Sequence, residues 1–200
     1  MQSIVIQAGW PIWPLIALSI VGLAIVIERA LSLNAARLIP RDLPTQVIQM
    51  VRAKADTPEA IEKLRASSPL GLILAELLRC RHLPPVELRS AVEDAGRDVS
   101  HILQKYLPAL ATVASIAPLM GLFGTVVGMI EIFAAYKPDG SDPTELARGI
   151  SIALYNTGLG ILIAIPAVMA HRLFKSRVEA LLLKMEQATR YVAQNIKHSA

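Results

Sequence analysis

Charged residues avoid three long stretches of the chain, residues 4–27, 106–130 and 149–170, which contain 24, 25 and 22 residues. About 20 apolar residues are enough for a helix to cross the hydrocarbon core of a bilayer, and slightly longer runs cross it with a modest tilt. One such run could be a buried helix of a soluble protein. Three of them in 200 residues leave too little polar sequence to cover a soluble core. The pattern therefore predicts an all-α integral membrane protein with three transmembrane helices.

Two of these spans are predicted to extend into the cytoplasm as long amphipathic helices. Apolar residues recur at alternating spacings of four and three before the second span and after the third, which lines one face of an α-helix. We expect the first of these helices to run straight into its span, and both seams to pack on each other and on shorter helices of the loop. The seams are Leu88, Val92, Ala95, Val99, Ile102 and Tyr106, and Phe174, Val178, Leu181, Met185, Ala188 and Val192.

The loop between the first two spans contains three signals for the start of a short helix. Asp42, the pair Asp56-Thr57 and the pair Ser67-Ser68 each stand within two residues of a following proline. Side chains of Asp, Ser and Thr cap the first turn of a helix, and proline is favoured in that turn. The loop is therefore predicted to be a series of short helices.

The basic residues are distributed unevenly among the segments outside the spans. Residues 37–105 hold 11 of the 20 lysines and arginines and the tail holds six, whereas the connector has two against three acidic residues. Because loops rich in lysine and arginine stay in the cytoplasm, we expect the loop and tail inside and the N-terminus and connector outside. The expected segments are residues 1–33 with the periplasmic N-terminal end and first span, 34–105 as cytoplasmic loop, 106–136 as second span, 137–148 as periplasmic connector, 149–171 as third span and 172–200 as cytoplasmic tail.

The first span is predicted to be retained. No basic segment precedes it and no small-residue cleavage signature follows it, because Glu28 and Arg29 come directly after it. Trp10 and Trp13 are expected to anchor its outer end at the lipid headgroups rather than to stack on a ligand, and Glu28-Arg29 to anchor its inner end.

The sequence indicates no enzyme, cofactor, metal site or nucleic-acid partner. The four histidines are scattered and Cys80 is alone, so no ligand set has zinc spacing and no internal disulfide can form. Walker and GxSxG motifs are absent from the sequence. The net charge is +4, but the basic residues form no run that would follow a phosphate backbone.

The remaining candidate chemistry is polar and lies inside the membrane. In the second span Thr125 shares a helical face with Gly121 and Gly128, and in the third Asn156 stands beside Thr157. Hydroxyl groups among small residues can line a narrow ion path, or they can hydrogen-bond their own helix backbone, and the sequence alone leaves both interpretations open. The third-span stripe of small residues is Ala153, Thr157, Gly160 and Ala164.

Helix packing accounts for a second group of residues in the spans. Small residues let membrane helices approach closely, and a proline removes a backbone donor, so that Pro166 frees the carbonyl of Leu162. Both Pro166 and Pro118 are interpreted as structural kinks. The residues predicted to serve packing are Gly121, Gly124, Gly128, Gly160 and Pro166.

Glu131 is a further candidate for the ion path. An ionisable residue within a span is a functional hypothesis by default. It stands six residues beyond Thr125, near the expected outer end of its span, so it can also simply reach the headgroups.

Each of the last two spans contains a longer motif. The motifs are Ser115-Ile-Ala-Pro-Leu-Met-Gly-Leu-Phe-Gly-Thr-Val-Val-Gly128 and Gly149-Ile-Ser-Ile-Ala-Leu-Tyr-Asn-Thr-Gly-Leu-Gly-Ile-Leu-Ile-Ala-Ile-Pro-Ala-Val168. The pair resembles the MotA/TolQ/ExbB proton-channel family, in particular its three-span ExbB/TolQ branch. Together with the topology, the resemblance covers effectively the whole chain.

The resemblance implies an inner-membrane homopentamer whose second and third spans surround a pore, with single-span ExbD/TolR/MotB-like partner helices inside it. The family's pore threonines correspond to Thr125 and Thr157, opposite an aspartate of the partner. Ion flow would then drive work in the periplasm or at the outer membrane, with a periplasm-spanning energy-transducing protein as a further partner. A glutamate of the ExbB and TolQ versions corresponds to Ile152, so the resemblance does not decide between proton and sodium.

Two other functions fit the sequence less well. A transporter component would be expected to show internal repeats and a pair of interrupted helices, which the sequence lacks. A structural membrane scaffold that organises partners through its cytoplasmic helices is the other alternative, and an ion-flux measurement distinguishes it from a channel subunit.

Overall fold

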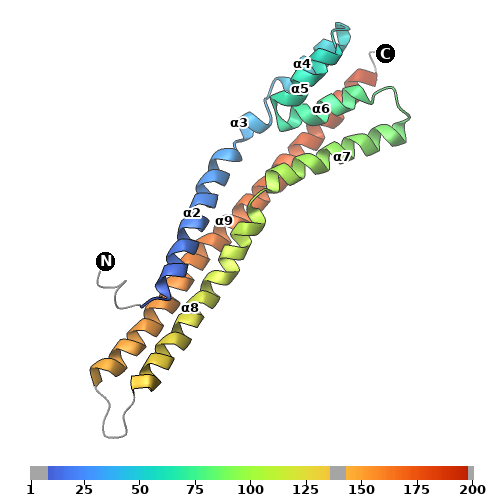
Figure 1. Ribbon diagram of the computed structural model, residues 1–200. Helices are drawn as coiled ribbons and strands as arrows, with labels where there is room; N and C mark the ends of the chain where they lie inside the picture. Colours follow the sequence, from blue (N-terminus) through green and yellow to red (C-terminus); the bar gives the residue numbers. More distant parts are fainter. Residues whose placement is uncertain (1–8, 136–142, 198–200) are drawn as a thin grey trace. The chain divides into compact units, whose positions relative to one another are not determined.

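The computed structural model describes residues 9–135 and 143–197, and every regular element within these ranges is an α-helix (Figure 1). This confirms the predicted fold class. Three of the helices are long and apolar enough to cross a membrane, with candidate spans at Ile12–Ser32, Leu107–Ala134 and Leu146–Ile196. The helices are α2 (Ile12–Ser32), α3 (Ala35–Leu38), α4 (Leu43–Arg52), α5 (Pro58–Ser67), α6 (Pro69–Arg79), α7 (Pro85–Gln104), α8 (Leu107–Ala135) and α9 (Pro143–Lys197).

The chain divides into two compact units, which are described separately. The first, called the membrane unit, comprises Met1–Arg29 and Tyr106–Leu173, and the second, called the loop unit, comprises Ala30–Lys105 and Phe174–Ala200. The helix of the third span, α9, begins at Pro143, earlier than the predicted residue 149. The first half of the predicted connector, residues 137–142, lies outside the described residues, as does the beginning of the first apolar stretch.

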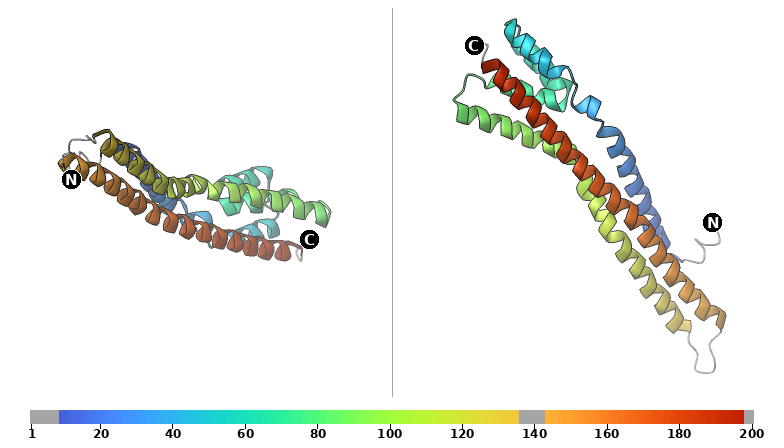
Figure 2. Two further views of the ribbon diagram at one scale, coloured as in Figure 1. Left: turned by 90° about the horizontal axis from the view of Figure 1, so that it is seen from below. Right: turned by 180° about the vertical axis from the view of Figure 1, so that it is seen from behind.

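Within the membrane unit, α2, α8 and the first part of α9 lie side by side (Figure 2). A Cβ placed on Gly22 of α2 would lie 3.1 Å from Cγ1 of Val113 on α8, so these two helices touch through a small residue. The other faces carry large exposed apolar side chains, as expected for a surface that meets lipid or another membrane helix. They include Leu119, Leu122, Val126, Ile130, Leu154, Ile161, Leu162 and Ile165.

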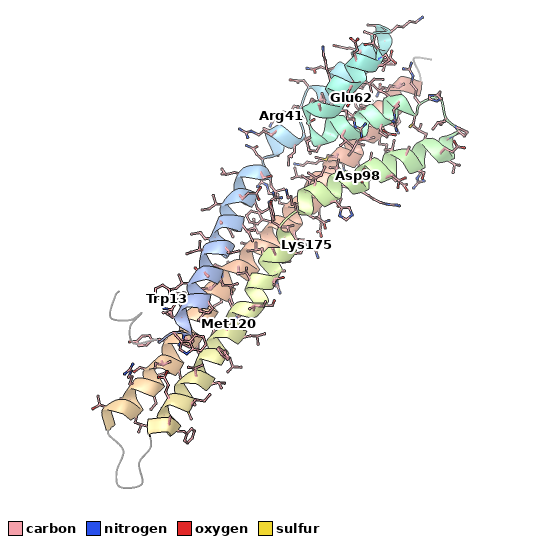
Figure 3. All side chains as sticks on the ribbon, viewed as in Figure 1. Trp13, Arg41, Glu62, Asp98, Met120 and Lys175 are labelled. Carbon is pink, nitrogen blue, oxygen red and sulfur yellow. The ribbon has the colours of Figure 1, made fainter. Side chains whose placement is uncertain are left out.

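The two tryptophans at the start of α2 are exposed, and the side chain of Trp13 is labelled in Figure 3. The ring of Trp10 packs edge-on against Phe123 of α8, with 5.9 Å between ring centroids. At the other end of α2, Arg29 is buried, forms an ion pair with Glu28 and lies 5.3 Å from the ring centroid of Tyr106. The helix continues past this pair to Ser32.

The core of the loop unit is formed by α6 and the predicted seam on α9. Leu70, Leu74 and Leu77 of α6 are buried. The α9 seam is confirmed, because five of its six members are buried and Ala188 is half-buried. On α7, Ala95 and Val99 are buried as predicted, but Leu103 takes the place of Ile102, which is exposed.

The expectation that the amphipathic helix runs straight into the second span is wrong. The α7 helix ends at Gln104, and α8 begins at Leu107 after Tyr106, whose φ of 65° lies in the left-handed region. The physical reason is Pro108. In a continuous helix its missing N–H would have bonded to the carbonyl of Gln104, and its ring would clash with that carbonyl. Proline is instead tolerated in the first turn of a new helix.

Candidate functional site

The candidate site is a stripe of very close contact between α8 and α9 inside the membrane unit. A Cβ on Gly121 would lie 2.9 Å from the carbonyl oxygen of Asn156, and one on Gly128 would lie 2.7 Å from that of Gly149. From the other side, a Cβ on Gly160 would lie 2.6 Å from the carbonyl oxygen of Ala117. Real Cβ atoms do not approach other atoms so closely, so these glycines allow the two backbones to touch.

Asn156 lies at the centre of this stripe. Its side chain is completely buried, and its Nδ2 donates a hydrogen bond to the carbonyl of Ile152 at 2.8 Å. A Cβ on Gly124 would lie only 2.3 Å from the Cβ of Asn156. A polar amide is thus enclosed between two apolar helices, where an unsatisfied polar group would be costly.

The two threonine hydroxyls make different hydrogen bonds. Thr157 Oγ1 donates across the helix contact to the carbonyl of Gly121 on α8, at 3.3 Å. Thr125 Oγ1 donates to the carbonyl of Leu122 in its own helix, at 2.6 Å. Both side chains are partly exposed. Since Gly121 and Thr125 are one helical turn apart, the two hydroxyls flank the same part of the stripe.

Each hydroxyl retains its acceptor lone pairs after donating its hydrogen. The arrangement can therefore offer oxygen acceptors to a water, an ion or a protonated acid on the exposed side of the stripe. It contains no acid or base of its own, because residues 106–130 and 149–170 carry no Asp, Glu, His, Lys or Arg. The stripe therefore offers hydrogen-bond acceptors but has no side chain that could store a proton.

Glu131 is not part of this constellation. It is exposed on α8, and its separation of six positions from Thr125 corresponds to a rise of about 9 Å and a different helix face. Ile152, for which the resemblance implies a glutamate in the ExbB and TolQ versions, is buried, and a Cβ on Gly9 would lie 3.7 Å from its Cδ1. The structure thus brings together Thr125, Thr157 and Asn156 and leaves Glu131 apart.

Pro166 and Pro118 both lie inside helices without ending them. The ring of Pro166 is exposed, whereas the neighbouring Ala164 and Ala167 are buried. A packing role for Pro166 therefore concerns surfaces outside the single chain and stays a prediction.

The sequence predicts that the third-span stripe runs through Thr157, with Asn156 as a polar group beside it. In the structure the buried positions of the third span are Gly149, Ile152, Asn156, Gly160, Ala164 and Ala167. The spacing of three and four residues from Gly149 through Ile152 or Ala153 to Asn156 and Gly160 was the available signal. Among the described residues no group of His, Cys, Asp or Glu could hold a metal ion.

Comparisons with known proteins agree with these features. The model of the MotA/TolQ/ExbB proton channel family matches residues 65–187, which include the whole stripe. The biopolymer transport protein exbB1 of Vibrio cholerae is 28% identical over 200 residues, covering 96% of this chain and 86% of that protein. The Tol-Pal system protein TolQ of Pseudomonas aeruginosa is 36% identical over 115 residues, covering 54% and 50%. TolQ of Haemophilus influenzae is 44% identical over 80 residues, covering 40% and 35%.

Proposed function

The chain belongs to the MotA/TolQ/ExbB proton channel family, and from this premise we propose that it is the ring-forming subunit of an ion-driven motor in a bacterial inner membrane. The ring, a homopentamer, would convert ion motive force into mechanical work for the transport of biopolymers or nutrients across the envelope. The observation that supports this best is the hydroxyl-flanked contact of α8 and α9, in which Thr157 bonds to Gly121 one turn from Thr125.

A partner that carries a carboxylate follows from the composition of the stripe. A relay that takes up and releases protons needs a titratable group, and the stretches 106–130 and 149–170 around Thr125 and Thr157 contain no Asp, Glu or His. An ExbD/TolR/MotB-like single-span protein with an aspartate at this depth would supply that group. The threonine oxygens would then accept a hydrogen bond from the protonated acid and stabilise the neutral form while it crosses.

The orientation proposed for the chain rests on its charge distribution. The loop and the tail carry 17 of the 20 lysines and arginines, which favours a cytoplasmic position for both and a periplasmic N-terminus. With three spans, the two ends then lie on opposite sides of the membrane.

The energy available limits how such a subunit can work. One elementary charge that crosses about 100 mV releases about 2.3 kcal/mol. A conformational step that disturbs several packed contacts costs more than this. We therefore expect several ions to pass for each mechanical step, as a ring of several identical paths allows.

The test is ion flux in liposomes that contain the chain with or without its single-span partner. We expect flux only with the partner, and loss of flux in Thr157→Val with membrane insertion and assembly retained. Thr157→Ser keeps the hydroxyl and should retain most of the flux. Normal flux through Thr157→Val would refute the assignment of Thr157 to the ion path.

Glu131 is proposed to serve as an interfacial residue. Because it is exposed and lies apart from the threonines, Glu131→Gln should retain much of the flux. Complete loss of flux in an intact assembly would instead assign Glu131 to the ion path.

A structural scaffold without ion conduction is the second candidate. The observation that favours it is that both threonine hydroxyls donate to backbone carbonyls, as threonines do when they only support helices. Absence of flux from a purified complex with its partner, under an imposed pH or sodium gradient, would support this alternative.

A further inference from the structure

The loop unit contains a groove that the proposed ion path does not use. It has a volume of about 1000 Å³ and lies among α6, α7 and the last part of α9. Its apolar lining includes Ile73, Leu77, Leu88, Val92 and Leu182. Thr189, which is buried and donates to the carbonyl of Met185 at 2.8 Å, also lines it.

The dimensions of the groove fit one face of a helix. Its lining residues on α7 run from Pro85 to Ser100, which spans about 22 Å at 1.5 Å per residue. With that length, the volume corresponds to a mean cross-section of about 45 Å². An α-helix with side chains is about 10–12 Å across, so roughly half of its cross-sectional area fits inside the groove. This is how an amphipathic helix lies in a groove, with its apolar face inside and its polar face outside.

Gly96 in the middle of α7 provides an independent indication. A glycine inside a helix is unfavourable compared with alanine, so it needs a reason. A Cβ on Gly96 would meet nothing within 4 Å, unlike one on Gly121 or Gly124. Packing within this chain therefore does not require the glycine. Gly96 lines the groove, where the missing side chain leaves room for close approach by another molecule.

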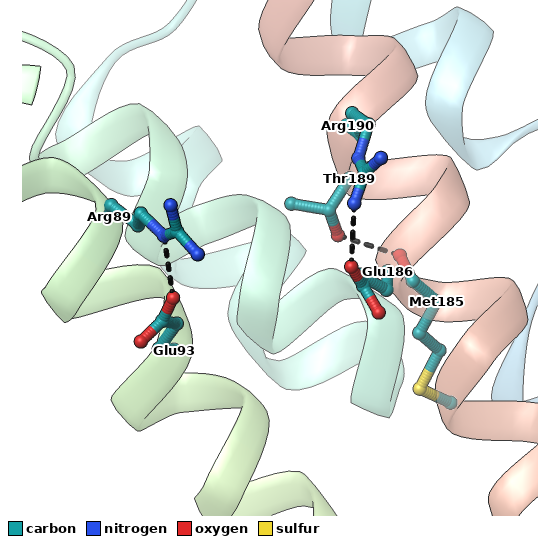
Figure 4. Close-up of polar contacts among 6 residues, drawn as sticks. All are labelled: Arg89, Glu93, Met185, Glu186, Thr189 and Arg190. Carbon is teal, nitrogen blue, oxygen red and sulfur yellow. Dashed lines mark hydrogen bonds and ion pairs between the residues drawn. The ribbon is translucent and has the colours of Figure 1, made fainter.

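Two ion pairs face each other across the groove (Figure 4). On α7, Arg89 Nε lies 2.7 Å from Glu93 Oε1, and on α9, Arg190 Nη2 lies 2.8 Å from Glu186 Oε1. The hydrogen bond and charge of Glu93 raise the pKa of Arg89, and the charge of Glu186 adds to this from the opposite helix.

The hydrogen-bond donors of the lining favour an acidic occupant. Four arginines and two glutamates line the groove, and the other two arginines, Arg81 and Arg97, pair with Asp56 and Asp94, which lie outside the lining. Each guanidinium carries five N–H donors, so an arginine in one ion pair can still bind a second carboxylate. With Asp56 and Asp94 included, four acids balance the four arginines. An incoming carboxylate would therefore bind to the guanidinium N–H donors that these ion pairs leave over.

We propose that this groove binds an amphipathic helical segment of a partner protein. The apolar face of that helix would pack on the apolar lining, one of its side chains would occupy the space beside Gly96, and its carboxylates would lie near the arginines. The proposal concerns the loop unit alone and stands or falls independently of ion conduction.

The probe for the test is a fluorescent helical peptide of about 15 residues with leucines at helical spacing and glutamates along one flank. Binding to the full chain in lipid nanodiscs is measured by fluorescence anisotropy. The first control peptide carries lysine in place of each glutamate, and the second has the same composition in an order without amphipathic spacing. We expect the acidic peptide to bind at least about tenfold more tightly than either control, a difference that should shrink at high salt.

Variants of the chain decide whether the groove is the binding site. Gly96→Leu should fill it and weaken binding at least about tenfold, whereas Ser90→Leu, on an exposed part of α7 outside the lining, should have little effect. Arg89→Ala and Arg190→Ala should weaken binding several-fold, and Arg79→Ala, which also breaks an exposed ion pair but outside the groove, should not.

Three results would overturn the proposal. One is the absence of measurable binding up to about 100 µM, which is too weak for a specific helix-in-groove site. Another is equal binding by the acidic and basic peptides. The last is that the original chain binds no peptide while Gly96→Leu changes the oligomeric state. The groove would then hold a second copy of this chain instead of a partner protein. Failure of ion flux, by contrast, would bear only on the proposed function.

Discussion

Asn156 shows how much a single residue controls in this membrane unit. It is the most buried of the polar and charged side chains in the described ranges, and it lies directly against Gly124. Its amide bonds to the turn of α9 before it, so the side chain is held in one orientation. The position of the neighbouring Thr157 hydroxyl against α8 therefore depends on the fit between Asn156 and Gly124.

A matched pair of glycine substitutions tests this fit. Gly124→Ala places a Cβ at 2.3 Å from the Cβ of Asn156, and since both atoms lie next to backbone, the helices must separate. We expect a loss of about 1–3 kcal/mol in stability, as for other overpacked cores, seen as a lower melting temperature of the purified protein. Gly158→Ala is the control, because a Cβ there meets nothing within 4 Å. Equal melting temperatures for the two variants would contradict the close contact.

The lone cysteine gives a second prediction at this scale. Cys80 is buried, and burial raises the pKa of its thiol, with a further contribution from the hydrogen bond to Glu76 at 3.3 Å. Since the thiolate is the reactive form, alkylation by iodoacetamide near neutral pH should be slow. We expect it to be at least about tenfold slower than that of a Ser90→Cys variant in a Cys80→Ser background. Comparable rates would show that Cys80 is accessible.

At the scale of the elements, the residues next to prolines explain where helices begin. Thr57 and Ser68 cap their helices as predicted, with Oγ atoms that accept from the N–H groups of Ala60 at 3.3 Å and Gly71 at 3.1 Å. Asp42 also precedes a helix but makes no side-chain cap hydrogen bond. A capping residue type shortly before a proline therefore marks the start of a helix in all three cases, but it caps the helix through its side chain in only two of them.

Alanine substitutions should separate these roles. Ser68→Ala removes a buried cap and should cost about 1 kcal/mol, within the usual range of about 0.5–2 kcal/mol for such residues. Asp42→Ala removes no cap hydrogen bond and should be nearly neutral. Denaturant or thermal unfolding of the two variants is the measurement, and a larger loss for Asp42→Ala than for Ser68→Ala would contradict the assignment.

The sequence predicts the helices well and the junctions between them less well. Hydrophobic periodicity finds the α9 seam because every turn repeats the same signal. The break at Tyr106 depends on one residue, Pro108, and the apolar run around it hides that signal. Periodicity alone also does not place the centre of the stripe at Asn156, because Asn156 and Thr157 differ by a helix rotation of only one residue.

At the scale of the whole molecule, composition and family membership predict more about the architecture than any single site residue does. The three spans follow from the absence of charge over sufficient length, and the family match covers the two spans that form the stripe. Oligomeric state, partner and ion are not encoded in a single chain in this way. They depend on surfaces that the chain presents to other molecules, such as the exposed apolar faces of α8 and α9.

The orientation of the chain in the membrane is the last prediction, and it follows from charge alone. If the loop is cytoplasmic and the connector periplasmic, a cysteine at Ala147, which is exposed near the start of α9, should react with a membrane-impermeant maleimide in intact spheroplasts. A cysteine at Ser90 should react only after the membrane is permeabilised. Both variants carry Cys80→Ser, so that each contains one thiol, and each should react fully in detergent. Labelling of position 90 but not of position 147 in intact spheroplasts would invert the topology. It would also place the groove beside Gly96 in the periplasm, where its helical partner would then have to be sought.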